Sequence, residues 1–279
     1  MNKISLLFCG IAFSSVILTS NSKKGSDRAI ANISQESTLA LVANGEDFVR
    51  QGFTSKDGWQ ISFDRVYVNI AQAIAYSTES GFEPRKGDTK KSINYQQKID
   101  FLGEAKTADL AAGDATAEPI LIEQIKVPQG FYNALSWTLD TAGSDSAIAG
   151  QTIALIGTAK KAGTTINFNL GFNQPTEYVC GEFIGDERKG IVAADSSGEV
   201  EATFHFDHIF GDADSPLEDA LNQDALGFEP IANLASNNNI DTNDVELANK
   251  LSNGDYQKLN KAIANLGHVG EGHCVITNR

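Results

Sequence analysis

The four histidines of the chain lie in two short windows of sequence. The first window reads Phe-His-Phe-Asp-His-Ile-Phe and contains His205 and His208, and the second reads Gly-His-Val-Gly-Glu-Gly-His-Cys and contains His268 and His273. Neutral imidazole is the commonest metal ligand among side chains, and each window also carries a carboxylate. The two windows therefore predict one metal site to which both contribute ligands.

Two carboxylates extend the candidate ligand set. Asp207 lies two residues after His205, so both side chains would face the same side of a strand. The glycines of the second window would let a short loop fold back, so that His268, Glu271 and His273 converge. Imidazole and carboxylate together suit zinc or copper, with iron or manganese as alternatives. The predicted metal ligands are His205, Asp207, His208, His268, Glu271 and His273.

The sequence leaves other roles for the histidines open. They could act as acid–base catalysts or make structural hydrogen bonds. A haem held by two histidines is also open, because the absence of a CxxCH motif argues only against covalent haem. The chain has no G-x-S-x-G nucleophile motif, no P-loop and no GxGxxG motif. The Asn-rich segment 237–246 lacks the glycine and the spacing of a calcium loop, so it indicates a helix-capping turn.

The acidic composition of the chain limits the kinds of partner that it is expected to bind. The chain has 36 acidic and 22 basic residues and a formal net charge of −14. Nucleic acids and anionic membrane surfaces both require basic protein surface, so neither is expected as a partner. The acidic balance instead gives a favourable field for a cation.

The N-terminus has the pattern of a secretory signal peptide over residues 1–22. A basic start at Lys3 precedes an apolar run that is too short to be a permanent transmembrane helix, and small polar residues follow. Phe8 stands before Cys9 where a lipoprotein signal needs a small residue, so lipidation is not expected. We predict an exported protein, periplasmic or secreted, whose mature chain has no integral membrane segment. In an oxidising compartment, the two remaining cysteines are expected to form the disulfide Cys180–Cys274.

Residue composition and hydrophobic patterning divide the rest of the chain into three parts. Residues 23–45 are polar and predict a flexible leader, residues 46–210 predict a β-sandwich domain, and residues 211–279 predict a helical C-terminal segment with the His/Cys loop. The fold class is mainly β, an antiparallel β-sandwich with a small α-helical C-terminal segment. Runs that alternate or are rich in β-branched residues predict strands at 59–63, 66–76, 120–125, 131–139, 152–158, 165–172 and 200–208. Helix starts are predicted near Asp214 or Ser215, which precede Pro216, near Asp241 or Thr242, and at Ser252.

These elements must position the histidines. The first window closes the last predicted strand, so Phe204 and Phe206 would face the core, and His208 would face away from His205 unless the strand ends before it. The second window follows the last predicted helix, which places the metal site at the junction of the sandwich and the helical segment. Trp59 and Trp137 alternate with polar residues and are expected in the core.

Short motifs in the stretch from Asp57 to Asp207 carry a family resemblance. They are a Trp-containing strand at Trp59, the turn Val127-Pro-Gln-Gly-Phe-Tyr132, and Gly157-Thr-Ala159 before a strand. With these motifs the chain resembles uncharacterised secreted bacterial β-sandwich proteins, and the turn is similar to one in periplasmic copper-binding proteins associated with methanobactin uptake. The resemblance covers about half of the chain and implies a fold and a compartment, with copper as a hint. The histidine windows lie outside the matched motifs, so it implies no ligand residue.

The sequence therefore predicts an exported periplasmic metal-binding protein that captures, delivers or senses a transition metal. The alternative is an adhesion or carbohydrate-binding β-sandwich module with structural histidines, which would need an exposed strip of aromatic side chains. A metal-dependent hydrolase is a third possibility, in which Glu271 would act as the general base.

Overall fold

Two mixed β-sheets form the framework of the protein. The computed structural model describes residues 37–79, 81–87 and 89–277. Strands account for 43% of the described residues and helices for 18%, so the predicted mainly β fold is confirmed. The signal peptide of residues 1–22, the lipidation question at Cys9 and most of the predicted leader lie outside the described residues. Every described helix is too short or too polar to cross a membrane.

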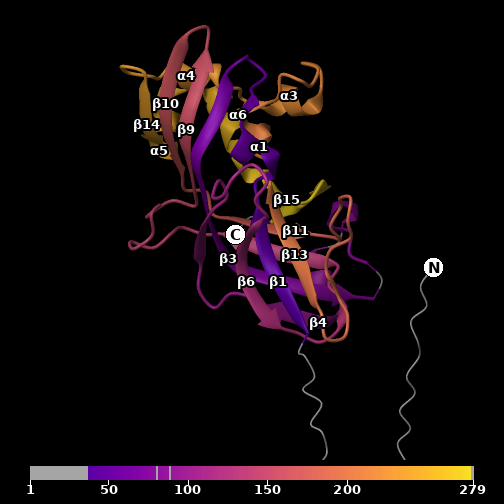
Figure 1. The fold of residues 1–279 in the computed structure, drawn as a ribbon. Coiled ribbons are helices and arrows are strands. Elements are labelled where there is room, and N and C mark those ends of the chain that lie inside the picture. The colour runs from indigo at the N-terminus through magenta and orange to yellow at the C-terminus, as the bar shows by residue number, and fades with distance from the viewer. Residues whose placement is uncertain (1–36, 80, 88, 278–279) are drawn as a thin grey trace, which may run out of the picture. The chain divides into compact units, whose positions relative to one another are not determined.

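The smaller sheet has five strands and carries both histidine windows at one end. Strand β1 lies between β13, to which it is parallel, and the edge strand β6, to which it is antiparallel (Figure 1). In spatial order the strands are β16 (Gly272–His273), β15 (Gly267–Val269), β13 (Ser197–Phe204), β1 (Thr38–Asn44) and β6 (Ile120–Lys126).

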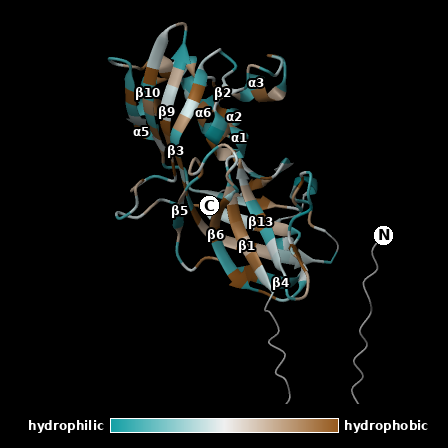
Figure 2. Ribbon diagram, in the orientation of Figure 1, coloured by the Kyte–Doolittle hydropathy of each residue, from teal (hydrophilic) through white to brown (hydrophobic). Residues whose placement is uncertain are grey.

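The larger sheet has ten strands and is organised around β3, which is 19 residues long. Hydrophobic and hydrophilic residues alternate along much of β10 (Figure 2), as expected for a strand with one buried face. The main path is β14 (Asn239–Asn243), β10 (Thr164–Phe172), β9 (Ile153–Lys161), β3 (Gln60–Thr78), β8 (Ala134–Leu139), β11 (Thr176–Cys180) and β17 (Val275–Thr277). The strands β2 (Phe53–Thr54), β4 (Tyr95–Asp100) and β5 (Lys106–Asp109) also pair with β3, and β7 (Gly130–Phe131) pairs with β12 (Ile191–Val192).

Short helices connect the strands. Helix α6 begins after Ser252, whose side chain accepts a hydrogen bond from the Asp255 N–H, so the predicted start is correct. Helix α5 begins at Asp244 after an Asn243 cap, close to its predicted start. The helix expected at Pro216 begins only at Ala220, so that prediction is wrong by one turn. The helices are α1 (Glu46–Gln51), α2 (Asp207–Phe210), α3 (Ala220–Asp224), α4 (Glu229–Ala232), α5 (Asp244–Lys250) and α6 (Asn253–Ala264), with 3₁₀ turns η1 (Pro84–Lys86) and η2 (Lys90–Ser92).

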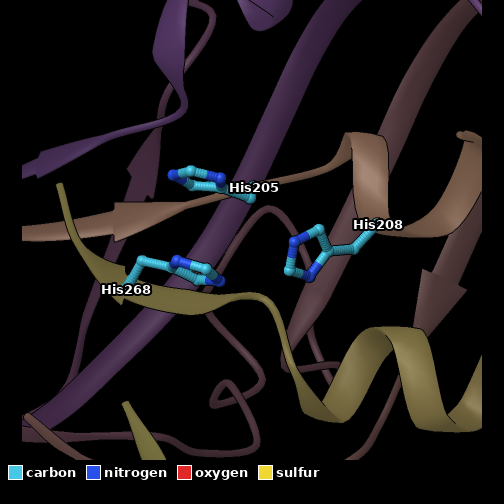
Figure 3. Close-up of side chains that lie close together, drawn as sticks. All are labelled: His205, His208 and His268. Atoms are coloured by element: carbon cyan, nitrogen blue, oxygen red, sulfur yellow. The ribbon is translucent and has the colours of Figure 1, made fainter. Parts of the chain in front are cut away.

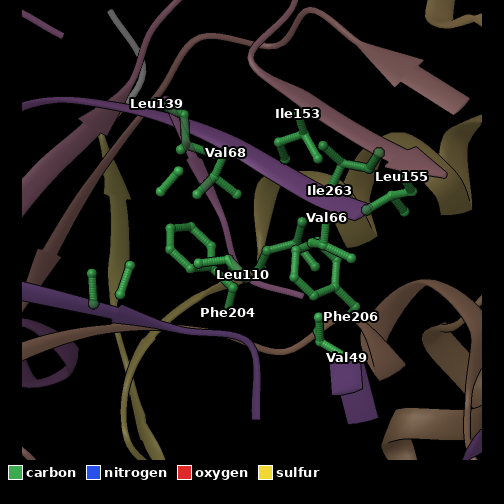
Figure 4. Packing of buried hydrophobic residues seen from close by; sticks show 14 of the residues in the cluster. Val49, Val66, Val68, Leu110, Leu139, Ile153, Leu155, Phe204, Phe206 and Ile263 are labelled. Carbon is green, nitrogen blue, oxygen red and sulfur yellow. The ribbon is translucent and has the colours of Figure 1, made fainter. Parts of the chain in front are cut away.

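The main hydrophobic core joins the two sheets. Phe204 of β13 meets Trp137 of β8 edge to face, with ring centroids 6.2 Å apart. Figure 4 shows Phe204 and Phe206 among aliphatic side chains from β3, β8 and β9. Both phenylalanines are fully buried, and Trp59 and Trp137 are buried as predicted. This packing fixes the end of β13, and with it the start of the first histidine window.

The predicted leader is wrong at its C-terminal end, because residues 38–44 form β1, an interior strand of the smaller sheet. Leu39, Leu41 and Ala43 are fully buried in the core. Thr38 pairs with Ser197 in parallel register, and this partner is far away in the sequence. Such a short apolar run inside a polar stretch gives little local evidence of a strand, because the pairing that stabilises it is non-local.

The boundary predicted at residue 210 does not separate two packing units. The C-terminal segment contains helices, as expected, and it also contributes β14, β15, β16 and β17 to the two sheets. The sheets are also not purely antiparallel, because β1 pairs with β13 and β10 pairs with β14 in parallel. A hairpin joins β9 to β10, with Ala162 and Gly163 both at positive φ in its turn.

We expect strand β1 to be essential for stability. Leu41→Ala should reduce the free energy of unfolding by about 2–5 kcal/mol, because it removes a fully buried side chain and leaves a cavity. Leu121→Ala on the neighbouring strand is the control, since Leu121 is 58% exposed and should change stability by less than about 0.5 kcal/mol. Urea unfolding measures both. Equal effects of the two changes would contradict a central role for β1.

Candidate metal centre

The first histidine window lies where β13 gives way to a helical turn. The strand ends at Phe204, and the backbone N–H of His208 then donates to the carbonyl of His205. Helix α2 begins at Asp207, so the expectation that His205 and Asp207 share one face of a strand is wrong. The turn has a useful consequence, because it brings His208 to the same side as His205 instead of the opposite face.

The second window forms a tight hairpin beside β13. His268 on β15 pairs with Thr203 on β13, and it also pairs with His273 on β16. Gly270 makes the turn at a φ of 58°, and a Cβ there would lie 2.0 Å from the carbonyl oxygen of Ile184. Only glycine fits this position without displacing the backbone.

The predicted disulfide is present and holds the end of this hairpin. Cys274, directly after His273, is bonded to Cys180 of β11, with the two Cα atoms 4.4 Å apart. The bond connects the smaller sheet's last strand to the larger sheet. It therefore restricts how far the second window can move from the first.

Three of the four histidines converge (Figure 3). One ring nitrogen from each of His205, His208 and His268 lies within 4.8 Å of the others. The rings of His205 and His268 are stacked with centroids 4.1 Å apart, and the ring of His208 lies 5.0 Å from that of His268 at a steep angle. His205 is 8% exposed and His268 is 2% exposed. This buried group can hold a metal ion.

The hydrogen bonds of the cluster fit a metal site. Nδ1 of His208 lies 3.1 Å from the carbonyl oxygen of Asn265 and must donate to it, so Nε2 of His208 is left as the ligand atom. Nε2 of His205 and both ring nitrogens of His268 are buried without a hydrogen-bond partner in the described structure, as is Oδ1 of Asp207. Buried polar atoms without partners are costly. A bound ion would provide a partner for one of the two ring nitrogens of His268.

Burial keeps the imidazoles neutral, which is the form that binds metals. The pKa of His268 falls to about 2, mainly through burial and then through the neighbouring histidines. Burial is also the main cause of the lowered pKa of His205, His208 and His273. Conversely, burial raises the pKa of the Asp207 carboxyl. Protons therefore compete weakly with a metal for these nitrogens.

The remaining predicted residues line the same cavity, which has a volume of about 440 Å³. The ring of His273 lies 4.4 Å from that of His268 and 6.1 Å from that of His208, but it is exposed and stands outside the three-histidine group. Glu271 is exposed at the rim, whereas Asp207 is buried. Across the cavity, α3 and α6 contribute the wall, which includes Leu221 and the ion pair of Asp224 with Lys261.

Glu46 also belongs to the site and was missed by the sequence analysis. Its Oε1 lies 3.8 Å from Nε2 of His205. Burial and the neighbouring carboxylates, Glu201 and Glu271 first among them, raise the pKa of Glu46 to about 7. No sequence spacing links Glu46 to the histidines, because strand β1 carries it to the site from the other end of the chain.

Comparisons of the chain with protein-family models, with curated proteins and with solved structures gave no match.

We expect the metal-free protein to lose stability as the pH falls below about 6.5, the ordinary histidine pKa. The imidazoles of the unfolded chain then bind protons, whereas the buried imidazoles of the folded protein stay neutral, so the free energy of the unfolded state falls relative to that of the folded state. Glu46 has the opposite effect on stability between pH 7 and pH 4.5. Its pKa is 4.5 ordinarily and about 7 in the folded protein, so in this range the folded state binds a proton that the unfolded state does not, and the fold gains stability as the pH falls.

The test is urea unfolding in the presence of a chelator at pH 7.5 and pH 4.5. The wild type should lose more stability between these pH values than His268→Gln, which cannot take up a proton at this position. Equal losses in the two proteins would show that His268 is not held neutral.

Proposed function

We propose that the protein binds one transition-metal ion through His205, His208 and His268, and that it captures and delivers this ion outside the cytoplasm. The convergence of three imidazoles from two distant windows, two of them buried and that of His208 half-buried, carries the proposal. Structural histidines usually find hydrogen-bond partners when buried. Here both nitrogens of His268 lack one within the described chain, which favours a ligand role over a structural one.

We propose zinc or divalent copper as the ion. Imidazole nitrogen suits both metals, and copper ranks above zinc in affinity for a given site. Monovalent copper prefers sulfur ligands. The two cysteines nearest the site are joined in a disulfide, and the only methionine of the sequence is Met1. The ligand chemistry therefore favours a divalent ion.

Three protein ligands suit exchange better than permanent storage. Structural zinc sites are closed by four ligands, whereas three ligands leave a position for water or an incoming group. The cavity beside the histidines gives access to that position. The carboxylates of Asp207 and Glu271 line it and add negative charge, which favours entry of a cation.

The compartment is part of the same proposal. The N-terminal pattern of a signal peptide and the resemblance to secreted β-sandwich proteins support export to the periplasm or beyond. A disulfide that persists needs an oxidising environment, so the Cys180–Cys274 bond supports it as well.

The carbohydrate-binding alternative receives less support. Such a module would present aromatic side chains on its surface, yet Trp59 and Trp137 are buried in the core. Tyr95 is the only aromatic residue among the exposed large hydrophobic side chains of the described chain. A single exposed ring is not the aromatic strip that sugar stacking would need.

A metal-dependent hydrolase is a second candidate, because the open coordination position and Glu271 face one cavity. With zinc bound, a hydrolase would cleave activated esters such as p-nitrophenyl acetate. Glu271→Gln would abolish that turnover without lowering the zinc content. Absence of zinc-dependent turnover in the wild type would leave metal capture as the function.

The metal proposal predicts one zinc or copper ion per chain. At a free metal concentration of 100 times Kd, binding should stabilise the protein by about 2.7 kcal/mol, seen as a rise in Tm. His268→Ala should lose the ion and this rise, because it removes one of three ligands. Metal analysis by mass spectrometry and thermal unfolding with and without chelator measure both quantities.

His273→Ala is the matched control, since His273 lies in the same hairpin but outside the three-histidine group. It should keep the ion. The proposal fails if the wild type binds neither metal, or if His268→Ala and His208→Ala both bind as well as the wild type.

A further inference from the structure

Glu46 is placed to orient a metal-binding histidine. Its Oε1 faces Nε2 of His205 at 3.8 Å, and this nitrogen is buried without a hydrogen-bond partner in the described chain. Metal-bound histidines usually donate their other ring N–H to a carboxylate or a carbonyl, which fixes the tautomer and the ring orientation. With Nε2 turned toward Glu46, the nitrogen of His205 that remains for an ion is Nδ1.

The same arrangement occurs at His208. Its Nδ1 donates to the carbonyl oxygen of Asn265, and its Nε2 is left for the ion. The two histidines of the first window would therefore coordinate through different nitrogens, each set by a partner on another element. Asn265 follows α6, and Glu46 begins α1.

A buried hydrogen-bond network holds Glu46 in place. The backbone N–H of Glu46 donates to Oδ1 of Asn44, at 3.1 Å, where β1 ends. Nδ2 of Asn44 in turn donates to Oε1 of Glu201, also at 3.1 Å. Glu46 adopts a φ of 59°, which is unfavourable for a residue with a side chain. The Asn44 side chain compensates by capping this strained turn.

Glu201 holds the second histidine window as well. Its carboxylate accepts a hydrogen bond from Oγ1 of Thr203 at 2.9 Å, and Oγ1 of Thr203 accepts the backbone N–H of Gly270 at 2.8 Å. Gly270 is the turn of the hairpin that carries His268. Lys189 pairs with the same carboxylate and balances its charge.

The position of Glu201 on β13 explains how one side chain reaches both turns. Glu201, Thr203 and His205 follow one another at a spacing of two residues, so the first two face one side of the strand, and His205 continues that line beyond the strand end. Glu201 is 3% exposed. A buried ion pair is weak evidence of a contribution to stability, because desolvation offsets the attraction. A role in positioning the two turns would explain why the chain keeps the Lys189–Glu201 pair.

We propose that Glu46 is a positioning residue for His205. Glu201, through its hydrogen bonds with Asn44 and Thr203, fixes the position of the Glu46 turn relative to the Gly270 turn. This inference rests on the proposed metal function. It adds residues that do not themselves bind the ion but determine the geometry of those that do.

The first test compares Glu46→Ala with Glu46→Gln. Loss of an outer hydrogen-bond partner typically weakens metal binding about 10- to 100-fold, and we expect this increase in the Kd for Cu²⁺ with Glu46→Ala. Glu46→Gln should be weakened less, because its amide oxygen can take the place of the carboxylate oxygen that faces Nε2–H of His205. The electron paramagnetic resonance spectrum of bound Cu²⁺ should change with Glu46→Ala, since the orientation of His205 is released. Loss of binding in both variants alike would identify Glu46 as a direct ligand and overturn the positioning role.

The second test removes the hydroxyl of Thr203. Thr203→Val should raise the Kd for Cu²⁺ about tenfold and alter the Cu²⁺ spectrum, whereas Thr203→Ser should restore both. Thr152→Val is the matched control. The Thr152 hydroxyl is also fully buried, donates to the carbonyl of Phe172 and accepts the N–H of Gln174, but it lies directly before β9 of the larger sheet.

The variants Thr203→Val and Thr152→Val should lower Tm to a similar degree, and only Thr203→Val should affect the metal. Unchanged Kd and spectrum in both Glu46→Ala and Thr203→Val, with copper bound normally by the wild type, would overturn this inference and leave the proposed function intact. Failure of the wild type to bind copper or zinc would instead overturn the proposed function.

Discussion

The antiparallel pairing of β15 with β13 is the interaction on which the site depends. It places His268 opposite Thr203, two residues before His205, and so joins two windows that are more than 50 residues apart in the sequence. The pairing is held from three directions. Phe204 packs against Trp137 in the core, the Gly270 turn is bonded to Thr203, and Cys274 is bonded to Cys180. Each of these contacts is buried or covalent, so the histidines meet in a rigid setting.

The site is rigid, and some of its buried polar atoms have no hydrogen-bond partner in the described structure. Burial lowers the pKa of the imidazoles, and three ring nitrogens of His205 and His268 have no hydrogen-bond partner in the described structure. Such an arrangement costs free energy in the metal-free state, and coordination would recover it. The surrounding carboxylates act in the same direction, because Glu46, Asp207 and Glu271 would lose their mutual repulsion when a cation enters. These costs of the metal-free state would therefore favour the binding of an ion.

The sequence predicted the parts of the site that depend on short spacing. The clustering of the histidines and the pairing of two isolated cysteines are visible in the primary structure, as are the strands with clear alternation. It did not predict β1 or Glu46, because both depend on the parallel pairing of Thr38 with Ser197. It also extended the strand pattern of Phe204 and Phe206 through Asp207, since alternation alone does not reveal the turn that the His205 carbonyl forms with the N–H of His208. What was missed is non-local pairing, together with a turn stabilised by the backbone.

X-ray absorption spectroscopy of the zinc-loaded protein would identify the ligand atoms, because it reports the atoms around the ion. A site built from three imidazoles should give nitrogen neighbours at about 2.0–2.1 Å with the multiple scattering of three imidazoles and no sulfur. A spectrum with sulfur at about 2.3 Å, or with fewer than two imidazoles, would contradict a site built from His205, His208 and His268.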